Sequence, residues 1–212
     1  MTYKEIQKNE VVNAYIKKGN DNLGVLGYTD HSSGHSSLVA ERAASILSAL
    51  DYDEHTIELA KIAGYMHDIG RHAEYGALLA DTILRDTDMS LEDRITVMST
   101  IGNHDESTGT AVDAVSAAVI IADKTDVRRN RVRSDSGMNF DIHDQVNYAV
   151  TNTELLIDTE KKVITLNLIV DEEICTMYEY FEIFLGRMMM CRRAAEMLGM
   201  KFKLRVNGSK VL

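Results

Sequence analysis

Apolar residues recur at intervals of three and four from about residue 33 to residue 129, which is the period of amphipathic α-helices. Gly70 follows one apolar run as a helix stop, and Ser90 with Asp93 approximates the capping box of a later helix. A further segment, AVDAVSAAVIIADKTDV, is apolar and alanine-rich enough to be a buried helix. The pattern therefore predicts a mainly α fold with about five short helices in this region.

The period changes after about residue 150. The segment TELLIDTEKKVITLNLIVD predicts a β-hairpin, because Ile164, Leu166, Leu168 and Val170 alternate on one face. A long helix is expected from about 172 to 198, and KFKLRV alternates again as a last strand. The helix carries a broad apolar stripe, namely Met177, Phe181, Phe184, Leu185, Met188, Cys191 and Ala195. We expect a helical domain over residues 1–150 and a small ββαβ unit over 151–212.

Composition narrows the class of protein. The 212 residues are 45% hydrophobic and 26% charged, which is typical of a soluble globular chain. A formal net charge of −10 argues against broad binding to nucleic acid or anionic lipid. The charged N-terminal segment is unlike a signal peptide, and no apolar run is long enough to span a membrane, so we expect a cytoplasmic protein.

The cysteines and methionines suggest no cofactor. Cys175 and Cys191 form no CxxC pair, so neither a disulfide framework nor a zinc ribbon is indicated. The run Met188, Met189 and Met190 is typical of core packing or of a homodimer contact. The motifs GxxxxGK, GxGxxG and GxSxG are missing from the sequence, so P-loop, dinucleotide-binding and serine-hydrolase functions have no support.

The segment GYMHDIGRHAEYG places His67 directly before Asp68 at the end of an apolar helical run, with His72 four residues further on. A buried charged pair without a partner is costly, and metal binding is one way to offset that cost. The dipeptide alone is a weak signal, because a solvated helix end also explains it and it recurs at residues 104–105 and 143–144. Other candidate ligands lie near predicted helix ends, which can converge on a metal in a helical bundle: His35, His104 and Asp123.

Taken in order, these residues resemble the H…HD…D pattern of the HD-domain metal-dependent phosphohydrolase superfamily. The segments HSSLVAERAASIL, KIAGYMHDIG and IIADKTD are similar to its first-ligand, HD and last-ligand helices. With His72 and His104 added, the order is similar to the dinuclear H…HD…H…H…D subset, as in bacterial diadenosine tetraphosphatase-like hydrolases. The resemblance covers residues 28 to 133, implies an HD-domain helical bundle, and does not extend to the tail.

The resemblance also implies a ligand set. One metal would be held by His35, His67, Asp68 and Asp123, and a second by Asp68, His72 and His104. Imidazole with carboxylate suits Fe, Mn, Co, Ni or Zn better than Mg or Ca. Two such ions can share a hydroxide that attacks phosphorus, with Asp68 as the bridging residue. Only three residues separate Asp68 from His72, so the site is mononuclear if His72 points away.

A basic segment, KTDVRRNRVR, follows Asp123 directly. Lys124 and Arg128 are spaced i, i+4, so on a helix they would share a face and could bind substrate phosphate, with Lys124 also stabilising charge during catalysis. The alternative is a solvated surface paired with acids such as Asp126. His31, four residues before His35, is either an exposed loop residue or a substrate contact beside the site.

The sequence thus favours a metal-dependent phosphohydrolase acting on a small phosphorylated substrate, and the resemblance suggests a nucleotide. An HD-fold di-iron oxygenase is one alternative, because such enzymes look similar in ligand pattern. A non-catalytic sensor that binds metal and nucleotide is another. Fold and ligands alone do not fix the reaction.

Overall fold

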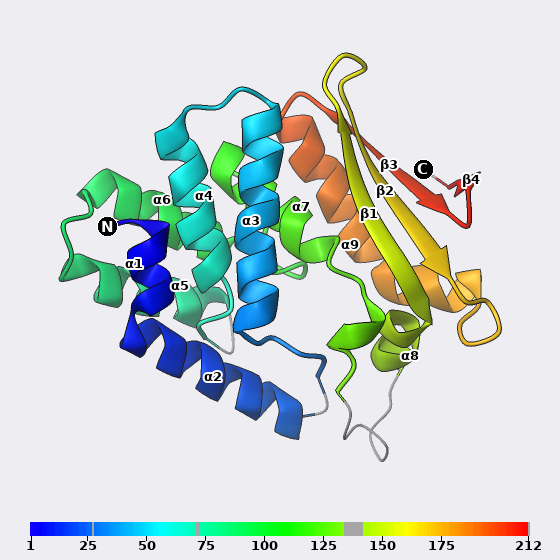
Figure 1. Cartoon of the computed structure of the whole chain (residues 1–212), viewed down its shortest axis with the longest axis horizontal. Coiled ribbons are helices and arrows are strands. Elements are labelled where there is room, and N and C mark those ends of the chain that lie inside the picture. Colours follow the sequence, from blue (N-terminus) through cyan, green and yellow to red (C-terminus); the bar gives the residue numbers. More distant parts are fainter. Residues whose placement is uncertain (27, 71–72, 134–141, 212) are drawn as a thin grey trace.

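Helices form most of the chain up to residue 149 (Figure 1). The structure is a computed structural model that describes residues 1–26, 28–70, 73–133 and 142–211. Its helices before the sheet are α1 (Tyr3–Lys8), α2 (Glu10–Val25), α3 (Ser33–Ala49), α4 (Glu54–Met66), α5 (Ala73–Arg85), α6 (Leu91–Gly102), α7 (Ala114–Lys124), the 3-10 turn Arg129–Arg131 and α8 (Ile142–Ala149). The mainly α prediction is confirmed.

Polar caps set several helix boundaries. Ser90 caps α6 by accepting a hydrogen bond from the Asp93 backbone, as the sequence predicts. Asp113 and Ser116 form a reciprocal capping box at the start of α7. Helix α4 ends at Met66, four residues before Gly70, because His67 is already its C-cap residue. The predicted glycine stop therefore lies beyond the actual end of the helix.

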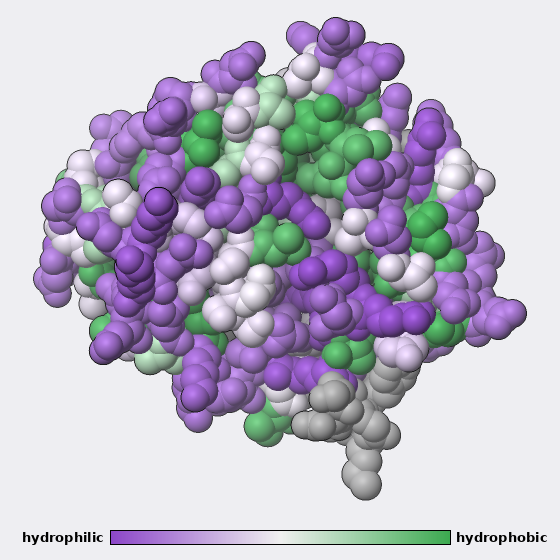
Figure 2. Space-filling model, viewed as in Figure 1, coloured by the Kyte–Doolittle hydropathy of each residue, from purple (hydrophilic) through white to green (hydrophobic). Residues whose placement is uncertain are grey.

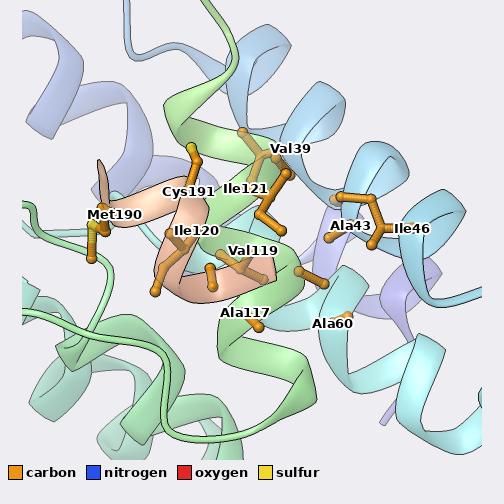
Figure 3. Close-up of a cluster of buried hydrophobic side chains, with 14 of the residues drawn as sticks. Val39, Ala43, Ile46, Ala60, Ala117, Val119, Ile120, Ile121, Met190 and Cys191 are labelled. Carbon is orange, nitrogen blue, oxygen red and sulfur yellow. The ribbon is translucent and has the colours of Figure 1, made fainter. Parts of the chain in front are cut away.

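Helix α7 is the centre of the molecule. Every residue from Val115 to Ala122 is buried, which is the pattern of a helix surrounded by other elements rather than one lying on the surface. Val39 and Ile46 of α3 pack on one side of it, and Met190 and Cys191 of α9 (Met177–Met197) pack on another (Figure 3). The last turn of α7 therefore has a fixed position relative to both parts of the chain.

The C-terminal part is a four-stranded sheet with one long helix. Strands β1 (Val150–Asp158) and β2 (Val163–Val170) form the predicted antiparallel hairpin. β3 (Lys201–Val206) pairs parallel to β2, and a short β4 (Ser209–Lys210) adds an edge that the sequence did not indicate. Asn207 and Gly208 both have positive φ, which suits the tight turn between β3 and β4. The predicted ββαβ order is present.

Helix α9 connects β2 to β3 and lies between the sheet and α7 (Figure 1). It begins at Met177 rather than near residue 172, because Thr176 and Glu179 form a capping box there. Phe184, Met188 and Cys191 are buried as expected, whereas Leu185 of the predicted stripe is 49% exposed. Buried apolar residues from both sides of residue 150 form one cluster. The division into two domains stays a prediction.

The outer surface is mostly hydrophilic in the view of Figure 2, with scattered apolar patches. None of the helices in the described ranges is long and apolar enough to cross a membrane. Cys175 and Cys191 are both buried and unpaired.

The contact between α3 and α4 depends on Gly64. A Cβ atom at this position would lie 3.0 Å from the Ala40 Cα atom, so the two backbones could not approach as they do. We expect Gly64→Ala to lower the free energy of unfolding by about 1–3 kcal/mol through overpacking. The measurement is the midpoint of urea unfolding at unchanged slope.

The matched control is Gly186→Ala in α9, where an added Cβ meets no atom within 4 Å. Since alanine is the better helix former, this variant should be up to about 1 kcal/mol more stable than the wild type. Equal stability of Gly64→Ala and the wild-type protein would contradict the close packing of α3 on α4.

Candidate metal centre

Ends of four helices meet at one point of the bundle. His35 lies in the first turn of α3, and His67 is the C-cap of α4 with Asp68 next to it. His104 follows the end of α6 closely, and Asp123 lies in the last turn of α7. Because α4, α6 and α7 approach this point with their C-terminal ends, their dipoles favour a positive charge there.

The side chains converge through their outer atoms. His35 Nε2 lies 3.2 Å from His67 Nε2 and 3.3 Å from Asp123 Oδ1. His67 Nε2 lies 3.0 Å from Asp68 Oδ2, and His104 Nε2 lies 3.6 Å from Asp68 Oδ1. Two overlapping groups, His35 with His67 and Asp123, and His67 with Asp68 and His104, each place their ligand atoms within 4.8 Å of one another. This is the donor set that a transition-metal ion prefers.

Each of the three histidines is oriented from the other side of its ring. His67 Nδ1 donates to the Gly64 carbonyl at 2.7 Å, and His104 Nδ1 donates to the Ile101 carbonyl at 2.6 Å. His35 Nδ1 donates to Asp126 Oδ2 at 2.7 Å. Since a carbonyl or carboxylate oxygen can only accept, each ring carries a proton on Nδ1, and Nε2 is the atom that can bind either a metal ion or a second proton.

The electrostatics of the cluster favour a cation. Burial disfavours a charge on His67, but the carboxylates of Asp68 and Asp123 outweigh it and raise the pKa of His67 to about 10. Burial likewise opposes charge on Asp68, yet the neighbouring histidines hold the pKa of this carboxyl well below its usual value. Asp68 Oδ2 is buried without a hydrogen bond of regular geometry. Its near neighbours are the Nε2 atoms of His67 and His35, and a bound metal ion could be shared by this oxygen and those nitrogens.

A cavity of about 360 Å³ opens directly onto the cluster. Asp68, His104 and Asp123 contribute to its wall, and their neighbours add both charges: Lys124, Arg131 and Arg187 are basic, whereas Asp105 and Glu106 are acidic. The carboxylates of Asp68 and Asp123 are 16% and 11% exposed, so an ion held there could also contact a molecule in the cavity.

The residues predicted from the sequence differ in where they lie relative to this centre. The structure brings together five of the six predicted ligands, and His72 lies outside the described residues. His31 lines the cavity, and its Nδ1 donates to the Thr29 carbonyl at 2.7 Å. Burial lowers the pKa of His31 to about 4, so its ring is neutral at pH 7. His55, in contrast, is an exposed residue paired with Asp93.

The two predicted phosphate contacts differ. Lys124 lines the cavity, with its Nζ atom 2.7 Å from Asp123 Oδ2. Arg128 is not part of the cavity wall, and both Nε and Nη2 of its guanidinium donate to the Asp126 carboxylate. The expected common helix face is wrong, because α7 ends at Lys124 and Arg128 has extended backbone.

Asp126 is the residue of this region whose role the sequence did not show. Its side chain is fully buried, and it joins His35 to Arg128. Although burial opposes it, the hydrogen bond from His35 and the charge of Arg131 lower the pKa of Asp126. Asp126 therefore carries a negative charge that fixes the His35 ring. Nothing in the sequence pointed to Arg187 either, because this residue lies outside the segment that resembles the family.

Comparison with known proteins adds one relative. The chain is 26% identical to the uncharacterized protein MJ1020 of Methanocaldococcus jannaschii, over 77% of this chain and 74% of that protein. No family model matches the chain, and no solved structure matches it. Since MJ1020 is itself uncharacterized, the geometry of the metal centre is the basis for assigning a function.

We expect Asp126→Asn to weaken metal binding about 10–100-fold, because the amide cannot replace the charge that orients and polarises His35. The measurement is a titration of the purified protein with Mn²⁺ or Zn²⁺. Asp93→Asn is the matched control, since it also removes a carboxylate from a histidine, His55, but at an exposed site. Equal metal affinity of Asp126→Asn and the control would contradict the positioning role.

Proposed function

We propose that the protein is a metal-dependent phosphohydrolase of the HD superfamily. One observation carries this proposal: the Nε2 atoms of His35, His67 and His104 converge with the carboxylates of Asp68 and Asp123, in the family's order along the chain, and Asp68, His104 and Asp123 of this cluster line a charged cavity. Each histidine is held through Nδ1 from outside the cluster. Such support is typical of metal ligands and is unnecessary for solvated histidines.

The residues fit one or two divalent transition-metal ions. His35, His67, Asp68 and Asp123 would hold the first ion, while Asp68, His104 and His72 would hold the second. The unsatisfied Asp68 Oδ2 atom and the mixed imidazole and carboxylate donors support this assignment. When bound, such an ion acts as a Lewis acid that lowers the pKa of water and polarises a phosphoryl oxygen.

The protein's own residues would bind and orient the phosphate. Lys124 places an ammonium group beside Asp123, where it can stabilise negative charge on a phosphoryl group. His31, neutral and with Nε2 unprotonated, can accept a proton or hydrogen bond from a ligand in the cavity. A cavity of about 360 Å³ suits a small ligand. We propose a nucleotide or another small phosphate ester as the substrate, hydrolysed in the cytoplasm.

We expect Asp68→Ala to lose bound metal and to release no phosphate, because it removes a carboxylate that contacts both His67 and His104. The measurement combines metal analysis with phosphate release from nucleotides, dinucleoside polyphosphates and sugar phosphates. The protein is purified anaerobically and loaded in turn with Fe, Mn, Co, Ni or Zn. Asp158→Ala, in the distant hairpin, is the control and should retain both properties.

An active Asp68→Ala protein without metal would refute the mechanism. A metal-loaded wild-type protein that hydrolyses no member of the panel would contradict the hydrolase assignment. Oxygen uptake that requires iron and substrate would then identify an oxygenase, and nucleotide binding without turnover would identify a sensor.

A further inference from the structure

The C-terminal part of the chain supplies one residue to the cavity, Arg187 of α9. Arg187 lies three residues after Phe184 and four before Cys191, so the three side chains lie along one side of the helix. Phe184 and Cys191 are completely buried. Their packing against the core fixes the rotation of α9 about its axis. Arg187, at the edge of this packed face, is thereby directed toward the cavity that also contains Asp123 and Lys124.

Two contacts hold the guanidinium group of Arg187 in place, but they do not use all of its N–H donors. The Cζ atom of Arg187 lies 4.5 Å from the centre of the Phe184 ring, and its Nε donates to Glu106 Oε2 at 3.0 Å. Within the described ranges, the hydrogen bond from Nε to Glu106 is the only one that this guanidinium makes, so both Nη groups are without a protein acceptor. Arginine carries five N–H donors in a planar fork, so the Nη edge remains available for a bidentate contact.

The other two cations of the cavity wall are engaged differently. The guanidinium of Arg131 donates to the backbone carbonyls of Asp30 and Asp126, which makes it a structural link between loops. Lys124 Nζ lies against Asp123, so its charge is partly neutralised by a candidate ligand. Arg187 is paired with Glu106, which is no part of the ligand cluster. Among the described basic residues of the cavity wall, Arg187 is thus the arginine whose Nη groups donate to no backbone carbonyl.

We propose that Arg187 binds the phosphate group of the substrate through its Nη edge, with Glu106 and Phe184 as its positioning residues. This inference deepens the proposed function and rests on it. It gives the C-terminal unit a direct part in substrate recognition. Phosphate suits the planar fork, because two oxygens of one group can accept both Nη hydrogen bonds at once.

The test is calorimetric titration of inorganic phosphate into full-length protein that has been loaded with Mn²⁺ and freed of excess metal. We expect Arg187→Gln to weaken phosphate binding about tenfold or more, because a charge-assisted contact is lost. The Mn²⁺ content should not change. Arg187→Lys should recover part of the loss, since it restores the charge but not the fork.

The matched control is Arg192→Gln, on the same helix, where Arg192 forms an exposed i, i+4 pair with Glu196. It should bind phosphate as the wild type does. Phosphate affinity that is unchanged in Arg187→Gln would overturn the inference, and so would acetate binding as tightly as phosphate. If phosphate binding depends on Arg187 but no phosphate ester is hydrolysed, Arg187 is a phosphate-binding residue and only the hydrolase proposal fails.

Discussion

The complete burial of α7 is the constraint on which the rest of the structure depends. An alanine-rich helix with valine and isoleucine on every side is stable only when other elements cover its whole circumference. α3 and α4 pack on α7 from the bundle, and α9 packs on it from the C-terminal part. The end of α7, with Asp123 and Lys124, is consequently held from both sides. The candidate metal centre is built at that end.

The polar cluster is compatible with the apolar core because each histidine is held through Nδ1 and the carboxylates of Asp68 and Asp123 reach the cavity wall, with Asp68 Oδ2 left for a cation. Carbonyl groups in the last turns of α4 and α6 serve as acceptors for two of the histidine Nδ1 atoms, namely those of Gly64 and Ile101. The third histidine, His35, instead uses the charged Asp126. Imidazole rings fixed in this way point their lone pairs at the carboxylates. That geometry is unfavourable without a cation between them, which is why a proton or a metal stabilises it.

The helices after residue 33 and the hairpin could be predicted because they depend on local patterns, whereas α1, α2 and β4 were not predicted. Periodicity locates helices, and the candidate ligands His35, His67 and Asp123 lie at helix ends in a recognisable order. The end of α7 was misjudged because no glycine or proline marks it. Thr125 is the C-cap residue, and its hydroxyl donates to the Ile121 carbonyl. This is a local hydrogen bond that apolar periodicity does not reveal.

Contacts between residues far apart in the sequence could not be predicted from local patterns. Asp126 contacts His35 across 91 residues of sequence, and Arg187 meets Glu106 across 81. Both contacts depend on how α3 and α9 are placed around α7, which is a property of the packed core rather than of any segment. The same dependence joins the two parts of the chain in function. A change that rotates α9, far from any ligand, would move Arg187 relative to Asp123 and so alter the cavity without touching the metal centre.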